Sequence, residues 1–79
     1  IAISTSGNSK NILKVLKLSK KLGIHSISFL GSSGGKAKNI ADIDLIVESN
    51  TTARIQESHI FLGHVIFEAV ENILIKNYK

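Results

Sequence analysis

The 79-residue chain contains no cysteine, proline, methionine or tryptophan, and aromatic residues make up only 5% of it. Without cysteine no disulfide framework can form, which suits the cytoplasm. Without proline or a long Gly/Ser stretch, no linker or domain boundary stands out. Hydrophobic residues nevertheless account for 43% of the sequence and charged residues for 20%, which is typical of a globular protein.

Targeting segments are also missing. No basic stretch followed by an apolar one opens the chain, so no secretory leader is predicted. The longest apolar stretch, Ile60 to Phe67, is interrupted by Gly63 and His64, and we expect it to be too short to cross a membrane. The chain does not begin with Met, and its first residues already have an apolar strand pattern. We therefore expect residues 1–79 to be a single partial domain, the C-terminal part of a larger one.

The basic residues are concentrated in one part of the chain. The formal net charge is +4, and most of the excess comes from lysines on one face of a predicted helix: Lys10, Lys14, Lys17, Lys20 and Lys21. No aromatic residues alternate with these lysines, and no nucleic-acid-binding motif is present. We therefore expect a solvent-exposed helix face and no nucleic-acid partner.

A hydroxyl-rich turn, Ser4-Thr5-Ser6-Gly7-Asn8-Ser9, separates an apolar strand from an amphipathic helix. Gly7 allows a backbone turn that other residues avoid, and Ser6, Asn8 or Ser9 can cap the helix. Free N–H groups and the positive end of the helix dipole then face the turn. A phosphate group fits such a turn, with hydroxyl donors from Ser4, Thr5, Ser6 and Ser9. The alternative, a polar N-cap without a ligand, explains the composition equally well.

Hydrophobic periodicity predicts alternating strands and helices. The expected order is a strand at Ile1–Ile3, a helix at Asn11–Leu22, a strand at Ile24–Leu30, a short helical piece at Lys36–Ile40, a strand at Asp42–Val47 and a helix at Ala53–Asn77. This order implies an α/β fold with a parallel sheet and right-handed crossovers. The glycine-rich loop after the second strand is either a second anion contact or a tight turn. Ligands of such sheets bind beyond the carboxyl ends of the strands, where three loops should converge: Ser4–Ser9, Gly31–Gly35 and Glu48–Thr52.

The predicted last helix is apolar on nearly all sides between residues 60 and 75. Such a helix must be buried on more than one side, so we expect it to contact a partner subunit as well as the sheet. His64 interrupts the apolar run and is either a core histidine bonded to a carbonyl group, or a metal ligand or general base. His59, five positions away, faces another side of the helix, so no paired site is expected. His25 is expected to be a partly exposed strand residue.

Two motifs together resemble the sugar isomerase (SIS) family, and within it the phosphoheptose isomerases. The family's phosphosugar loop is similar to Ile3-Ser4-Thr5-Ser6-Gly7-Asn8-Ser9 with its following amphipathic helix. The final helix of phosphoheptose isomerases is similar to Thr52-Ala53-Arg54-Ile55-Gln56-Glu57-Ser58-His59 followed by Gly63-His64. Between them, the family pattern is matched by Gly34-Gly35-Lys36 and Ala41-Asp42.

The resemblance implies the C-terminal part of a flavodoxin-like, three-layer α/β/α SIS domain with a long C-terminal helix. It also implies a cytoplasmic homotetramer that converts sedoheptulose 7-phosphate to D-glycero-D-manno-heptose 7-phosphate through a metal-assisted enediol, for the heptose of bacterial lipopolysaccharide. His64 would then be the catalytic acid or base, and the substrate would be bound by Ser4, Thr5, Ser6, Ser9 and Gln56.

The resemblance further implies one zinc ion per subunit, with Gln56 and His64 among its ligands. The family's other functional His and Glu, on an earlier helix, have no counterpart here, so the chain alone is expected to be inactive. An alternative of another class is a non-catalytic SIS regulator that binds the replication initiator, since such proteins keep the Arg-Ile-Gln-Glu stretch. They tend to lose the metal-site histidine, so His64 favours the enzyme. A sugar-phosphate sensor and a truncated product without function of its own are further alternatives.

Overall fold

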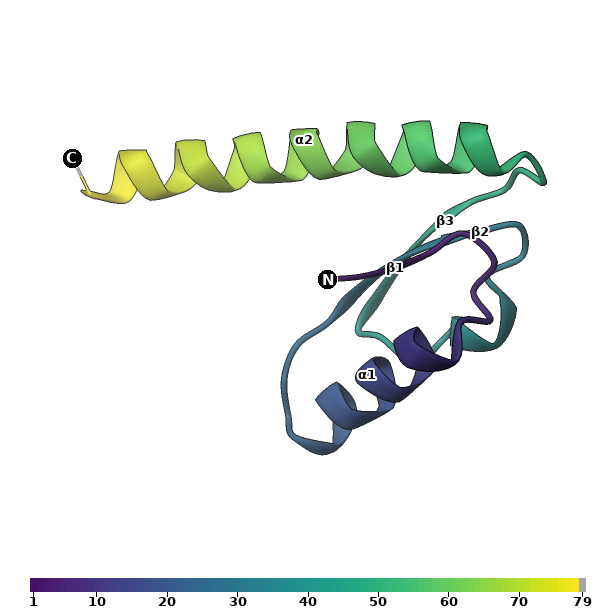
Figure 1. Ribbon diagram of the computed structural model, residues 1–79. Coiled ribbons are helices and arrows are strands. Elements are labelled where there is room, and N and C mark those ends of the chain that lie inside the picture. Colours follow the sequence, from purple (N-terminus) through teal and green to yellow (C-terminus); the bar gives the residue numbers. More distant parts are fainter. Residues whose placement is uncertain (79) are drawn as a thin grey trace.

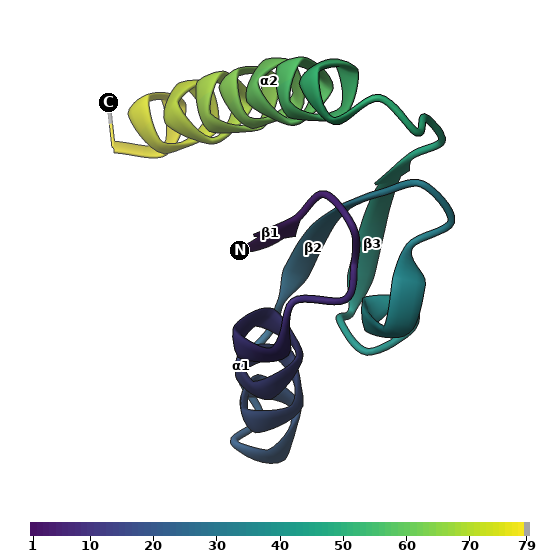
Figure 2. The same cartoon turned by 45° about the vertical axis from the view of Figure 1, so that its right-hand side comes forward.

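The computed structural model describes residues 1–78 and contains three strands and two long helices in alternating order. The elements are β1 (Ala2–Ser4), α1 (Lys10–Lys21), β2 (Ile27–Gly31), a 3-10 helix η1 (Gly35–Ala37), β3 (Ile43–Val47) and α2 (Thr52–Tyr78). The strands form a parallel sheet in the order β1-β2-β3. α1 and η1 lie on one face of the sheet and α2 lies along the other (Figure 1; Figure 2). The predicted α/β fold, with its parallel sheet and long C-terminal helix, is confirmed.

The core lies between the sheet and α1. Ala2 and Leu30, from neighbouring strands, pack there with Leu16 of α1 and Ala37 of η1. Because successive side chains of a strand alternate between the two faces, Phe29 points to the opposite face, toward α2. The single buried position of α1, Leu16, is the centre of its apolar stripe, so its lysines remain in solvent.

Two of the predicted boundaries were wrong by three residues. The second strand begins at Ile27 rather than Ile24, because the Ile24 N–H donates to the carbonyl of Ser19 (2.9 Å) and so belongs to the cap that ends α1. His25 therefore lies in a loop, with its side chain fully exposed, and is not a strand residue. The short helical piece ends at Ala37 and not at Ile40.

The first strand is only partly buried. Ala2 and Ser4 face α1 and are buried, whereas Ile1 and Ile3 are 61% and 53% exposed. The two isoleucines share the sheet face on which α2 lies, but α2 contacts chiefly β2 and β3. The prediction of a buried strand is therefore wrong for these two side chains within the described residues.

α2 is attached to the sheet near its beginning. Ile55 and His59 are its only buried residues among those described. Beyond them, large apolar side chains are exposed, namely Ile60, Phe61, Val65, Phe67, Val70, Ile73, Leu74 and Ile75. The apolar surface that predicts a partner subunit is thus open in this chain, and the partner stays a prediction.

By length and composition α2 passes the test for a helix that could cross a membrane. Residues Thr52–Asn77 reach a mean hydropathy of 1.3 in an 18-residue window, of which 11% is buried. The stretch Ile60 to Phe67, which by itself is too short, thus belongs to a longer apolar helix that has the length of a membrane span. One such helix is weak support for a membrane span, since core helices of soluble proteins can be as long and as apolar. Glu68 and Glu71 lie inside the segment, and carboxylates are costly in hydrocarbon.

Candidate active site

The hydroxyl-rich loop after β1 is stabilised by its own side chains. The Gly7 N–H donates to Ser4 Oγ (3.0 Å), and the Asn8 N–H donates to Ser6 Oγ (3.1 Å). Ser9 occupies the N-cap position of α1 but makes no side-chain capping bond. The predicted side-chain cap is therefore wrong, because Ser6 bonds to the N–H of a residue that precedes the helix, and Asn8 bonds elsewhere.

The glycine-rich loop after β2 supports the hydroxyl-rich loop. Asn8 Oδ1 accepts a hydrogen bond from the Lys36 N–H, and the Gly7 carbonyl accepts one from the Ala37 N–H, both at 2.9 Å. Gly7 has a positive φ of 71°, and a Cβ at this position would lie 1.9 Å from the Gly34 carbonyl oxygen. Of the two interpretations of the glycine-rich loop, the structure favours a tight turn, whose backbone packs directly against the hydroxyl-rich loop.

The start of α1 is suited to an anion. Its first regular hydrogen bond runs from the Leu13 N–H to the Ser9 carbonyl, so the N–H groups before Leu13 have no acceptor within the helix. The first turn carries no acidic residue, and Lys10 lies in it. The positive end of the helix dipole is therefore not neutralised by any carboxylate in this turn.

The four predicted hydroxyls differ in accessibility. Ser6 and Ser9 are exposed and Thr5 is half-buried, so these three can meet a ligand from solvent. Ser4 is only 7% exposed, and its oxygen already accepts the Gly7 N–H. In this structure Ser4 shapes the loop, and the other three hydroxyls are the ones that a phosphate could reach.

The three loops at the carboxyl ends of the strands do converge. Besides the bonds between the first two loops, the Ser32 N–H and Oγ both donate to the Ser49 carbonyl, at 3.1 and 3.3 Å. Gly31, the last residue of β2, approaches the first loop so closely that a Cβ there would lie 2.4 Å from the Thr5 carbonyl oxygen. The predicted convergence of loops at this edge is confirmed.

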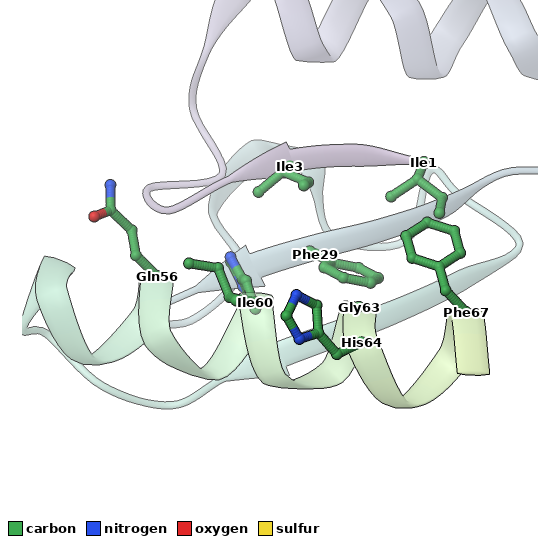
Figure 3. A pocket seen from close by; sticks show the side chains of 9 residues that line it. Ile1, Ile3, Phe29, Gln56, Ile60, Gly63, His64 and Phe67 are labelled. Atoms are coloured by element: carbon green, nitrogen blue, oxygen red, sulfur yellow. The ribbon is translucent and has the colours of Figure 1, made fainter. Parts of the chain in front are cut away.

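Gln56 and His64 line the same cavity, and the hydroxyl-rich loop lies outside it. Both line a cavity of about 490 Å³ between α2 and β1, here called the α2 groove, with Ile1, Ile3, Phe29, His59, Ile60, Gly63 and Phe67. In Figure 3, Gln56 and His64 lie along the side of α2 that faces Ile1 and Ile3. Positions 56, 60 and 64 share one helical stripe because they recur every four residues. No serine of the hydroxyl-rich loop lines the groove.

The chain by itself does not hold a complete metal site. Among the described residues no three His, Cys, Asp or Glu side chains are grouped to hold an ion. Gln56 and His64 are eight residues apart, a rise of about 12 Å along a straight helix. Both side chains can reach one zinc ion only if they lean toward each other along the helix, and a zinc site needs about four ligands. Further ligands would have to come from outside this chain.

The sequence did not lead us to expect that His59 is buried and hydrogen-bonded. It is 4% exposed, its Nε2 lies 2.8 Å from the Leu30 carbonyl oxygen, and its ring is tilted against Phe29 at 5.6 Å. The interpretation of a core histidine bonded to a carbonyl therefore describes His59, whereas His64 is exposed. The spacing of four from Ile55 was the available signal, because it places both side chains on the stripe that faces the sheet.

The fold and these loops define the class of the protein. It is a three-layer α/β protein of the kind that binds ligands beyond the carboxyl edge of a parallel sheet. No family model matches the chain. It is 51% identical over 74 residues to the phosphoheptose isomerase of Clostridium acetobutylicum, which covers 94% of this chain and 38% of that protein. It is 47% identical over 77 residues to the phosphoheptose isomerase of Aneurinibacillus thermoaerophilus, covering 98% of this chain and 39% of that protein.

A solved structure matches as well. The structure of phosphoheptose isomerase GmhA from Neisseria gonorrhoeae superposes with a TM-score of 0.83 and 39% sequence identity, over 86% of this chain and 39% of that one. The chain is therefore a relative of the phosphoheptose isomerases, and the resemblance inferred from its motifs is confirmed. It spans 38% of the length of the Clostridium protein.

Proposed function

We propose that the protein containing this chain is a phosphosugar isomerase that converts sedoheptulose 7-phosphate to D-glycero-D-manno-heptose 7-phosphate. The observation that carries the proposal is the 51% identity to a phosphoheptose isomerase over 94% of the chain. The hydroxyl-rich loop, which suits a phosphate, and His64, whose imidazole can transfer a proton, support it. This reaction would supply heptose for a bacterial surface polysaccharide.

In the proposed reaction the hydroxyl-rich loop binds the phosphate. Thr5, Ser6 and Ser9 donate hydroxyl hydrogen bonds, and the free N–H groups at the start of α1 add the helix dipole. Ser4 keeps the turn in shape through the Gly7 N–H. The phosphate is remote from the reacting carbons of the sugar, so its binding energy serves to position them.

His64 is the proposed acid or base. Exchange between a ketose and an aldose moves a proton between neighbouring carbons through an enediol, and an exposed imidazole can take and return that proton. Gln56, on the same stripe of α2, can bind a sugar hydroxyl through its amide. Because the serines do not line the α2 groove, the sugar must extend from the loop toward α2, or reach these residues in another subunit.

Zinc remains part of the proposal through the family resemblance alone. His64 could supply one ligand, and Gln56 a second, with the remaining ligands from outside the chain. Zinc at such a site would polarise the sugar's carbonyl oxygen. We also propose a cytoplasmic homotetramer, for which the exposed apolar side chains of α2 provide an available surface.

The test is isomerase activity of the full-length protein with sedoheptulose 7-phosphate, in zinc and in chelator. We expect turnover that chelator abolishes. His64→Ala should abolish turnover while leaving sugar-phosphate binding nearly intact, and His25→Ala, at an exposed loop position, is its matched control. Ser6→Ala should weaken binding about tenfold, as expected for one lost hydrogen bond to a charged group, and Ser19→Ala is its control.

Binding without turnover by the unmodified protein would contradict the isomerase. That result would favour a non-catalytic sugar-phosphate-binding regulator or sensor, and a pull-down with the replication initiator would then test the regulator. Turnover that is unaffected by chelator would contradict the zinc part of the proposal only.

A further inference from the structure

We infer that His59 is a positioning residue, which holds α2 on the sheet so that Gln56 and His64 keep their place relative to the carboxyl edge. The inference rests on the proposed function and assigns a task to a residue that the proposed reaction does not use. It is argued from the hydrogen bond of His59, its burial and its location near the carboxyl edge of the sheet. The small number of buried residues among those described in α2 supports it further.

The hydrogen bond of His59 defines its tautomer. The Leu30 carbonyl oxygen can only accept, so Nε2, at 2.8 Å, must carry the hydrogen. Nδ1 is then a bare acceptor, and it is buried without a hydrogen-bond partner among the described residues. A leucine would fill the same space without burying an unpaired polar atom. The advantage of histidine over leucine at this position is therefore the hydrogen bond that Nε2 donates.

This bond is made at the junction of α2 with the edge that carries the loops. Leu30 is followed by Gly31, and a Cβ at Gly31 would lie 2.4 Å from the Thr5 carbonyl oxygen and 2.6 Å from Ile55 Cδ1. The hydroxyl-rich loop, the end of β2 and the first turns of α2 thus touch one another here. A bond to Leu30 fixes the position of α2 along its own axis, and its rotation about that axis, relative to the hydroxyl-rich loop.

α2 has few other attachments that could do this. Ile55 is its second buried residue, and an apolar contact resists rotation of the helix less than a directed hydrogen bond does. Gln56 lies three residues before His59, and His64 lies five residues after it. Because a helix moves as a stiff rod, loss of the bond would displace both residues together. A displacement of about 1 Å is enough to slow a reaction about 100-fold.

The experiment compares three variants of the full-length protein for kcat, KM and thermal midpoint. His59→Leu removes the bond and keeps the bulk, and His59→Gln restores an N–H donor. Leu16→Val, in the core under α1, lowers stability away from α2 and is the control. For His59→Leu we expect kcat to fall about 10- to 100-fold, with a smaller rise in KM because Gln56 is displaced as well. His59→Gln should recover most of kcat, and Leu16→Val should keep both constants.

Other results overturn the inference. Equal kinetics of His59→Leu and Leu16→Val would reduce His59 to a packing residue, and failure of His59→Gln to recover kcat would exclude the donated bond. A large rise in KM alone would make His59 a substrate contact. If the unmodified protein turns over no sugar phosphate, the proposed function fails separately. In that case the positioning role is tested by crystal structures of the unmodified protein and of His59→Leu. If α2 has the same position on the sheet in both, the positioning role is refuted.

Discussion

Replacement of Gly7 by alanine tests whether the two loops at the sheet edge interlock as described. Gly7 has a φ of 71°, and its new Cβ would lie 1.9 Å from the Gly34 carbonyl oxygen and 2.5 Å from the Gly34 carbonyl carbon. Both are backbone atoms, so no side-chain rotation relieves the contact. The loops must move apart by more than about 1 Å to restore ordinary van der Waals distances.

The cost has two parts. A non-glycine residue in the left-handed region costs about 1 kcal/mol, from strain that is partly offset by the smaller entropy of the unfolded chain. Separation of the loops also breaks the bonds from the Ala37 N–H to Gly7 and from the Lys36 N–H to Asn8. At about 1 kcal/mol each, they add about 2 kcal/mol. We expect Gly7→Ala to lower the free energy of unfolding by about 3 kcal/mol.

Gly23 provides a matched control. Its φ is 73°, but nothing lies within 4 Å of a Cβ placed there. Gly23→Ala therefore carries the backbone strain without the clash and should cost about 1 kcal/mol. Urea denaturation of the full-length protein measures both values, provided that the slopes stay equal. Gly7→Ala should also weaken sugar-phosphate binding. Equal losses of stability for Gly7→Ala and Gly23→Ala would refute the interlocked loops.

Two further substitutions test the sheet and α2. Asp44 accepts hydrogen bonds from the fully buried Ser28 hydroxyl and from a backbone N–H, so Asp44→Ala should cost about 2–3 kcal/mol in urea denaturation. A loss no larger than that of Glu48→Ala, at an exposed carboxylate that makes no hydrogen bond among the described residues, would contradict the buried bond. Arg54 pairs with Glu57 at 2.7 Å, but both side chains are more than 60% exposed. Arg54→Ala should therefore change stability by less than about 1 kcal/mol, and a larger loss would mean that Arg54 has another partner in the full-length protein.

Most elements of the fold could be predicted because their signals are local. The helical periodicity of residues 10 to 21 and the apolar stretches at β2 and β3 were sufficient for the order of elements and for a parallel sheet. The start of β2 was misplaced, because Ile24 and the residues after it have a strand-like composition. A backbone bond to Ser19 holds Ile24 at the end of α1 instead. Gly23, with its positive φ just after the helix, is the signal for this cap, but it does not indicate how far beyond it β2 begins.

The candidate site was predictable only in part. The hydroxyl-rich loop and the shared stripe of Gln56 and His64 follow from composition and from helical spacing. The burial of His59 was missed, although its spacing of four from Ile55 places it on the stripe of α2 that faces the sheet. The difference from His64 arises from where α2 meets the sheet: His59 faces Leu30 and Phe29, and His64 faces the open groove.

The sequence by itself determined the types and order of the elements, the anion-suited turn before α1 and the relationship to the phosphoheptose isomerases. These depend on residues within a few positions of one another and on the order of motifs. The tertiary structure was needed to learn that Asn8 bonds to Lys36, and that His59 bonds to Leu30. These partners are 28 and 29 residues apart, and they meet only because parallel strands bring their carboxyl ends to one edge.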